Sequence, residues 1–223
     1  MSTATQIAEF DHFTDPEIIQ RVLSGDTRLY ELIIRRNNPD LYKIGRAYGY
    51  NHHDVEDLMQ ETYVSAYRSL AGFKNNSGLK TWLTRIMLNH CYQKKQKHSY
   101  VKEVLMENNH EIQQPMFQQQ AGTGKTVLNR ELGHVIENAL NGIPEEYRLV
   151  FTLRELNGLN VAETAELTQL SASNVKVRLN RAKTMLREKI EEMYSTDEIY
   201  EFNLVYCNKM VERVMAEINK SLI

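Results

Sequence analysis

Residues 144–189 read PEEYRLVFTLRELNGLNVAETAELTQLSASNVKVRLNRAKTMLREK, and this stretch predicts the fold of the C-terminal half of the chain. The apolar residues Val150, Leu153 and Leu156 recur at helical spacing up to an Asn-Gly stop signal at 157–158. A short helix over about 161–167 then precedes a long helix, for which Ser171 or Ser173 can serve as the N-cap. The order of short helix, tight link and long helix predicts a helix-turn-helix motif.

The long helix combines an apolar stripe with a polar and cationic exterior. The stripe that we expect to be buried consists of Val175, Leu179, Ala182 and Leu186. In a helix-turn-helix the first turns of the second helix meet base edges in the major groove of DNA. The residues that we expect to contact the duplex are Ser171, Ser173, Asn174, Lys176, Val177, Arg178, Arg181 and Lys183. A plain solvated face is the alternative interpretation. The small Ala165 in the short helix favours the motif, because two helices must approach closely there.

One residue of the link departs from the common pattern of this motif. Many such turns carry glycine, whereas this chain has Gln169 after Thr168. A residue other than glycine can adopt the left-handed conformation at a cost of about 1 kcal/mol. We therefore expect the motif to form with a turn that differs in detail.

Composition limits the class of protein. The 223 residues include 27 Lys and Arg against 29 Asp and Glu, and the net charge of −2 argues against indiscriminate binding to nucleic acid. No apolar run approaches the roughly 18 residues of a membrane span, and the N-terminus lacks a secretion signal, so we expect no membrane insertion and a cytoplasmic location. Cys91 and Cys207 form neither a metal pair nor a disulfide framework, and the adjacent histidines predict no metal site. Strand patterns are nearly absent, which predicts an all-α fold.

A second block of helices is expected from residue 15 to residue 98. Helices are predicted over about 16–23, with Asp15 as the N-cap, and over about 26–36 and 39–48. A longer helix that Asn51 caps follows them. On that longer helix the acids Asp54, Asp57 and Glu61 share one exposed ridge, with Gln60 beside them. Acids in a first turn often do no more than complement the helix dipole. Since Glu61 lies further along the helix, a docking ridge for a basic partner is the competing interpretation.

The sign of the charge reverses after this ridge. Residues 74–98 contain six basic and no acidic residues, and Phe73, Trp82 and Tyr92 are interleaved with them. Cations that follow a backbone and rings that stack on bases are typical of single-stranded nucleic-acid binding. Trp82 can equally be a core residue, because Leu83, Ile86, Met87 and Cys91 form a predicted buried stripe beside it.

Three segments together resemble bacterial sigma factors, the promoter-recognition subunits of RNA polymerase. Residues 54–68, DVEDLMQETYVSAYR, resemble the run D-x-E-D-L-x-Q-E-x-F-x-x-A-Y-R. Residues 80–86, KTWLTRI, are similar to F-x-x-W-L-x-x-I, and residues 174–182, NVKVRLNRA, to T-V-K-S-R-L-x-R-A. With two regions and a short connector, the chain resembles the small extracytoplasmic-function (ECF) group, which lacks the middle domain.

The resemblance implies a fold, a set of partners and a role for each segment. It implies two small helical domains, region 2 (residues 15–98) and the region 4 helix-turn-helix (129–191), joined by a flexible linker (99–128) and followed by a helical extension (192–223). Asp54, Asp57, Gln60 and Glu61 would dock on the clamp helices of the largest subunit of core RNA polymerase. The residues that would melt and hold the minus-10 element of promoter DNA are Asn75, Asn76, Lys80, Trp82, Arg85 and Asn89. The helix from Ser171 would read the minus-35 element. An anti-sigma factor is a further partner that the family allows, and neither a cofactor nor a catalytic residue is implied.

Two other function classes compete with a sigma factor. A DNA-binding regulator that dimerises through its N-terminal helices would use the same helix-turn-helix, but it would need neither the acidic ridge nor the acid-free basic helix. A phosphate-loop enzyme is suggested by AGTGKT at residues 121–126. However, Gln119 occupies the position of the first glycine, and a glutamine-rich segment replaces the strand that should lead into the loop.

The C-terminal segment from about Glu192 carries a separate apolar pattern. Its apolar residues recur at spacings of three and four, which predicts one or two amphipathic helices. The recurring residues are Ile199, Phe202, Tyr206, Met210, Val211, Val214 and Ile218. Packing against the helix-turn-helix domain and a role as an autoinhibitory or partner-binding helix are both open, and Cys207 beside the stripe allows a redox role.

Overall fold

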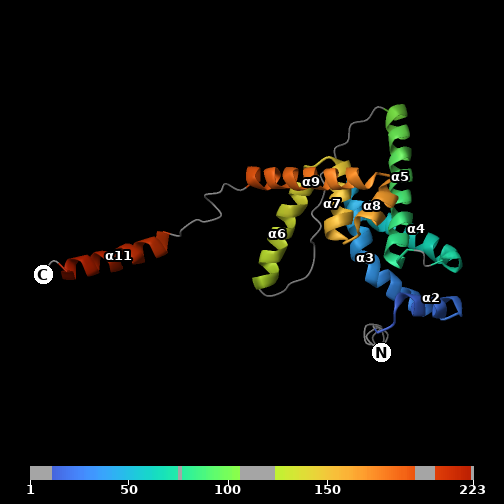
Figure 1. The fold of residues 1–223 in the computed structure, drawn as a ribbon, viewed down its shortest axis with the longest axis horizontal. Coiled ribbons are helices and arrows are strands. Elements are labelled where there is room, and N and C mark those ends of the chain that lie inside the picture. Colours follow the sequence, from blue (N-terminus) through green and yellow to red (C-terminus); the bar gives the residue numbers. More distant parts are fainter. Residues whose placement is uncertain (1–11, 75–76, 106–123, 194–203, 222–223) are drawn as a thin grey trace. The chain divides into compact units, whose positions relative to one another are not determined.

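The computed structural model describes residues 12–74, 77–105, 124–193 and 204–221, and every regular element in these ranges is a helix or a helical turn (Figure 1). The all-α prediction is therefore confirmed. The chain divides into two compact units, residues 1–186 and residues 187–223. Within the described ranges, no helix is long and apolar enough to cross a membrane.

The N-terminal bundle brings three long helices together around one core. Its elements are α2 (Asp15–Leu23), η2 (Thr27–Leu29), α3 (Tyr30–Ala47), α4 (His52–Ser69), η3 (Leu70–Gly72) and α5 (Leu79–Leu105). Helices α3, α4 and α5 pack against one another in all three pairings. The side chains that the bundle buries almost completely include Ile18, Ile33, Leu41, Ile44, Val55, Leu58, Ala66, Leu70, Leu83, Met87 and Cys91.

Capping side chains fix where two of these helices begin. The Asn51 side chain accepts a hydrogen bond of 2.9 Å from the backbone N–H of Asp54, which confirms the predicted N-cap of α4. At α2 the N-cap is Thr14 rather than the expected Asp15, and its N–H and hydroxyl both donate to the Glu17 carboxylate. The helix therefore begins one residue earlier than predicted, with Asp15 in its first turn.

The predicted break between residues 36 and 39 is wrong. Helix α3 continues through Pro39 from Tyr30 to Ala47. A proline inside a helix removes one backbone hydrogen bond and costs about 3 kcal/mol. Ile33 before the proline and Ile44 after it are both buried to 1% exposure or less, so packing along the whole helix outweighs this local cost.

A glycine allows α3 and α4 to approach closely. A Cβ atom built on Gly45 would lie only 2.7 Å and 2.8 Å from the two methyl groups of Val55, and 3.1 Å from Met87 Cε. Real Cβ atoms essentially never come within 3 Å of another atom, so the close approach of α3 to α4 and α5 requires the absence of a side chain at this residue.

The C-terminal half of the first unit contains the predicted helix-turn-helix. Its elements are α6 (Gly124–Asn141), α7 (Glu145–Phe151), the π-helical turn η4 (Thr152–Leu156), α8 (Val161–Thr168) and α9 (Ala172–Met193). Leu140, Ile143, Phe151 and Ala182 form its small core. Of the apolar residues expected inside the first helix, Val150 and Leu153 are buried, whereas Leu156 is 37% exposed.

Helix also occupies both ends of the segment 99–128 that was expected to be a linker. Helix α5 extends to Leu105 and α6 begins at Gly124, while the residues between them lie outside the described ranges. The GKT sequence at 124–126 thus forms the first turn of α6. A phosphate-binding loop would require these residues to follow a strand, and the described part of the chain has none.

The second unit contains the predicted C-terminal helix, α11 (Leu204–Ser221). Its described apolar side chains are about half exposed: Met210, Val211, Val214, Met215 and Ile218. Ile199 and Phe202 of the expected stripe lie outside the described residues, and the side chains of Tyr206 and Cys207 are not described either.

Candidate nucleic-acid and polymerase interfaces

The turn of the helix-turn-helix forms as expected, with glutamine in the left-handed region. Gln169 has φ of 56° and ends α8, and the N–H of Leu170 donates to the carbonyl of Ala165 at 3.0 Å. Asn160 and Glu163 cap the start of α8 reciprocally through bonds of 2.8 Å and 2.9 Å. On the far side of the turn, Ser171 accepts a hydrogen bond of 3.2 Å from the N–H of Asn174. Ser171 rather than Ser173 is therefore the N-cap of α9.

Helix α9 buries one stripe and exposes the face predicted to read DNA. Val175 and Ala182 are fully buried, whereas Leu179 and Leu186 are half-buried. The exposed residues of the predicted set are Ser171, Ser173, Asn174, Lys176, Val177, Arg181 and Lys183, and Arg178 is partly exposed. Val177 is 47% exposed among these polar residues, and an apolar side chain at such a place can contact the methyl group of thymine.

Two cations further along α9 contact their own domain. Lys183 pairs with Glu155 of η4 at 3.0 Å, and Arg181 donates to the hydroxyl of Tyr147 at 3.3 Å. Both remain exposed, so a phosphate could compete for them. Ser173, Asn174 and Lys176 of the predicted set are exposed in the first turns of the helix.

Trp82, Arg85 and Asn89 share one partly exposed side of the basic helix α5, whereas Lys80 lies near the start of the helix on a different side. Trp82 is half-buried and packs on Phe73, with ring centroids 5.0 Å apart and the planes tilted by 44°. It therefore contributes to the core and still shows part of its ring. Asn89 is exposed, while Leu83, Met87 and Cys91 lie in the core as predicted. Asn75 and Asn76 lie outside the described residues.

Both of these cations, Lys80 and Arg85, are paired with acids of the chain itself. Lys80 Nζ lies 2.7 Å from Asp40 Oδ2 of α3, and Arg85 Nη2 lies 2.6 Å from Glu166 Oε1 of α8. Thr81, which the sequence gave no reason to select, is buried and donates to Glu163 Oε1 at 2.8 Å. These acids come from segments distant in the sequence, so no local pattern could have identified them.

Only part of the acidic ridge of α4 is available to a partner, because two of its carboxylates lie close to cationic residues of α5. Asp57, Gln60 and Glu61 are exposed on a surface groove that also includes His90 and Lys94 of α5. Glu61 lies 3.6 Å from His90 Nδ1, and Asp54 forms a salt bridge with Lys94. The structure thus brings Asp57, Gln60 and Glu61 together as an outward surface, whereas Asp54 is held by the neighbouring helix.

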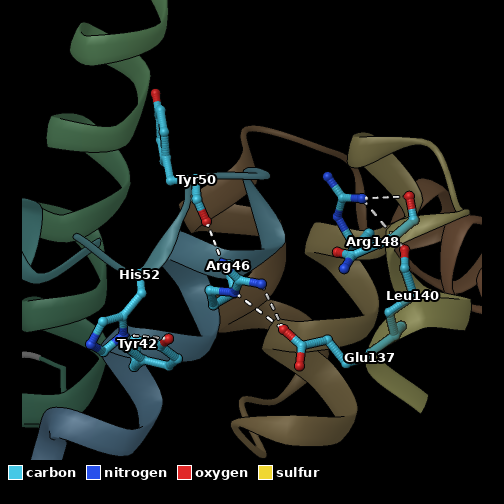
Figure 2. Close-up of polar contacts among 8 residues, drawn as sticks. Tyr42, Arg46, Tyr50, His52, Glu137, Leu140 and Arg148 are labelled. Atoms are coloured by element: carbon cyan, nitrogen blue, oxygen red, sulfur yellow. Dashed lines mark hydrogen bonds and ion pairs between the residues drawn. The ribbon is translucent and has the colours of Figure 1, made fainter. Parts of the chain in front are cut away.

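A buried ion pair joins α3 to α6 (Figure 2). Arg46 Nη2 and Nε lie 2.7 Å and 3.2 Å from Glu137 Oε1, and the two side chains are only 5% and 9% exposed. Arg46 also donates to the carbonyl of Tyr50 at 2.9 Å. Charges this deeply buried stabilise a structure only when paired. The sequence gave no sign of this contact between residues 91 positions apart.

A second arginine links the two halves through backbone carbonyls. Arg148 Nε donates to the carbonyl of Ala47 at 2.7 Å, and its Nη1 faces the carbonyls of Asn141 and Ile143. Figure 2 shows its contact with the carbonyl of Leu140. Burial lowers the pKa of this guanidinium from its usual value. A cavity of about 230 Å³ lies beside these arginines, and α3, α6, α7 and η4 line it mainly with apolar atoms.

No cluster of three or more His, Cys, Asp or Glu side chains in the described ranges could hold a metal ion. Burial raises the pKa of the Cys91 thiol to about 12, so it stays protonated and unreactive at neutral pH.

Known families and proteins match both halves of the chain. Residues 33–100 match Sigma-70 region 2, and residues 134–186 match Sigma-70, region 4. The ECF RNA polymerase sigma-E factor of Haemophilus influenzae is 27% identical over 187 residues, which cover 82% of this chain and 98% of the relative. The ECF RNA polymerase sigma-E factor of Escherichia coli K12 is 27% identical over 188 residues, covering 82% and 97%.

Two solved structures share the fold. CnrH in complex with the cytosolic domain of CnrY has a TM-score of 0.56 and 21% identity, covering 80% of this chain and 97% of that one. The sigma factor RpoE of Bartonella quintana, in complex with the anti-sigma factor NepR, has a TM-score of 0.60 and 21% identity, covering 73% and 96%.

Proposed function

Because the chain belongs to the sigma-70 family, as an ECF sigma factor that directs promoter-specific initiation of transcription, we propose that three of its surfaces divide this work. The first turns of α9 read the minus-35 element as duplex. The exposed face of α5 holds the unpaired non-template strand of the minus-10 element. The acids of α4 dock on the clamp helices of the largest polymerase subunit.

The exposed start of α9 is the observation that carries this proposal. Fully buried Val175 fixes the rotation of the helix, and this rotation turns Ser173, Asn174, Lys176 and Val177 outward. Hydrogen-bonding side chains, a cation and one apolar group are the combination that direct readout in a major groove requires. Arg178 beside them can contact guanine in a bidentate manner.

Replacing Arg178 tests the minus-35 assignment. We expect Arg178→Ala to weaken binding of the holoenzyme to its promoter by about 1–3 kcal/mol and to relax specificity at one base pair. Promoter variants at each minus-35 position, compared in binding and run-off transcription assays, measure both effects. An equal loss on every sequence would show that Arg178 contacts a phosphate, because the backbone carries no base identity.

The minus-10 assignment rests on Lys80, Trp82, Arg85 and Asn89. Trp82, Arg85 and Asn89 combine an aromatic ring, a cation and an amide on one side of α5, and Lys80 adds a second cation near the start of the helix. Rings that stack on bases and cations that track a backbone suit a single strand. Asn75 and Asn76 join this set through the family pattern. Capture of exposed bases would drive melting, so strand separation needs no nucleotide hydrolysis by this chain.

The docking assignment rests on the exposed carboxylates of Asp57 and Glu61, with Gln60 between them. Acids that project from a rigid helix complement basic partners and speed their association. Asp54 supports the ridge indirectly, because its salt bridge with Lys94 fixes α4 against α5.

The remaining partners follow from this role. Bond formation belongs to the polymerase, so the chain acts as a specificity subunit without a catalytic residue, and it works in the cytoplasm where the polymerase transcribes. The two similar folds in complex with CnrY and NepR support an anti-sigma protein as a further partner.

Run-off transcription with purified core polymerase tests the whole proposal. Sequence-specific operator binding by a dimer without polymerase would support the competing regulator instead.

A further inference from the structure

The cavity beside Arg46 and Arg148 lies apart from the surfaces assigned to polymerase and DNA. Its walls come from α3, α6, α7 and η4. Ala47 and Leu140 of this lining are buried, whereas Leu156 is 37% exposed and borders solvent. Since apolar atoms form most of the surface, the two arginines meet the cavity mainly through their aliphatic stems. The fold thus provides an apolar pocket with charged groups at its margin.

The size and chemistry of this cavity favour a small apolar occupant over water. A buried water molecule needs about two to four polar partners, which apolar walls do not supply. An apolar cavity of about 150 Å³ binds benzene, so about 230 Å³ has room for roughly nine carbon atoms at the same volume per carbon. A phenyl ring with a short alkyl chain matches this volume.

The charges around the cavity are not balanced. Its lining contains the cations Lys43, Arg46 and Arg148 but only one acid, Glu137. Glu137 pairs with Arg46, and Lys43 Nζ lies 3.2 Å from Asp40 Oδ1. Arg148 forms no ion pair within the described residues, because its hydrogen bonds all go to backbone carbonyls. Figure 2 shows this difference between the two guanidiniums.

The acid nearest in sequence to Arg148 is engaged elsewhere. Glu145 attracts the Arg148 guanidinium, but Lys95 Nζ lies 2.7 Å and 2.8 Å from the two carboxylate oxygens of Glu145. Burial and the repulsion by Arg46 both lower the pKa of Arg148. A guanidinium in these surroundings gains from an additional anion, and a carboxylate matches its planar, forked geometry.

We propose that this cavity binds a small apolar molecule that ends in a carboxylate. The hydrocarbon body packs against Leu140 and the aliphatic stems, and the carboxylate pairs with Arg148. None of the lining residues belongs to the surfaces of α4, α5 and α9 assigned above, so the inference does not rest on those assignments. Because the ligand contacts α3 as well as α6, its binding free energy adds to the stability of the folded chain.

Three ligands with the same phenylpropyl body isolate the role of the charge. Phenylpropanoate, phenylpropanol and phenylpropylamine are titrated into the full chain by calorimetry at neutral pH. We expect the acid to bind about three- to tenfold more tightly than the alcohol, because a charge-assisted bond to partly exposed Arg148 adds modestly to the binding of the body. The amine should bind most weakly. Equal affinities of acid and alcohol overturn the carboxylate, and no binding of any of the three overturns the site.

Filling the cavity tests where the ligand binds. Leu156→Trp places an indole ring at the exposed edge of the cavity, and we expect it to weaken phenylpropanoate binding by at least about fivefold, because the ring takes up space that the ligand needs. Leu23→Trp is the control, since Leu23 is 52% exposed on α2 and lies outside the cavity. An unchanged affinity in Leu156→Trp, or an equal loss in Leu23→Trp, contradicts the location.

Methyl resonances in NMR spectra report the location without any variant. We expect phenylpropanoate to shift the methyl signals of Ile136 and Leu140, which line the cavity, and to leave those of Met215 and Ile218 in place. The latter two belong to the half-exposed stripe of α11, where an apolar molecule could bind nonspecifically. Shifts on α11 with none at Ile136 and Leu140 would show surface binding and overturn the cavity as the site.

Replacing Arg148 tests its pairing with the carboxylate. Arg148→Met keeps an apolar stem and removes the cation, so we expect the acid and the alcohol to bind within about twofold of each other, whereas Arg148→Lys should retain part of the preference. Urea unfolding controls for the lost contacts of Arg148 with backbone carbonyls. A preference for the acid that persists in folded Arg148→Met overturns the pairing. Should this variant not fold, the three ligands on the unaltered chain decide.

Discussion

Removing the carboxylate of Glu137 should destabilise the N-terminal bundle. In Glu137→Ala the Arg46 guanidinium, which is 5% exposed, keeps the carbonyl of Tyr50 but loses the acid that two of its nitrogens contact. Removing one partner of a buried ion pair typically costs about 3–5 kcal/mol. Since α6 can move away and let water reach Arg46, we expect the lower end, a fall of about 3 kcal/mol in the free energy of unfolding.

Trp82 provides the assay, because it is the single tryptophan of the chain and packs against the bundle core. Urea unfolding followed by its fluorescence should show a lower midpoint for Glu137→Ala. The double variant Arg46→Met/Glu137→Leu should recover most of the loss, since replacing a buried pair by apolar side chains of similar size is often neutral. A midpoint for Glu137→Ala equal to that of the unaltered chain would refute the reasoning, because it would mean that Arg46 is hydrated without its partner.

Three further perturbations test other parts of the structure. Charge reversal in Asp57→Lys/Glu61→Lys should weaken holoenzyme assembly at least tenfold in a competition assay for core polymerase, while the unfolding midpoint changes little. Gly45→Ala should lower the free energy of unfolding by about 1–3 kcal/mol through overpacking, because its Cβ would lie 2.7 Å from a methyl group of Val55. Cys91, with its pKa raised to about 12 by burial, should resist alkylation at pH 8.5 in a Cys207→Ser background and react once urea unfolds the chain.

Matched variants give each of these tests its control. Glu56→Lys reverses an exposed charge on α4 outside the docking groove, so an equal loss of assembly would mean that net charge rather than the ridge controls docking. Gly78→Ala adds a methyl group where nothing lies within 4 Å, and a loss as large as that of Gly45→Ala would contradict the overpacking argument. Rapid alkylation of folded Cys91 would contradict its burial.

Local signals in the sequence predicted much of the fold. The side chain of Asn51 caps α4, Ser171 caps α9 and Gln169 adopts the left-handed turn, because each depends on residues within four positions of one another. The helical period likewise predicted which side of α9 is buried. The prediction failed at Pro39, where burial of α3 on both sides of the proline outweighs its local preference.

The amino-acid sequence by itself determined that the chain is helical, that it contains a helix-turn-helix and where acids, cations and rings gather along it. These properties depend on period, capping and composition, which act over a few residues. Only the tertiary structure decided that Glu137 neutralises Arg46 and that Glu166 reaches Arg85, because such pairs join residues 91 and 81 positions apart. The packing of the helices therefore decides which charges remain available to polymerase and DNA. An ion pair forms wherever the fold brings opposite charges together.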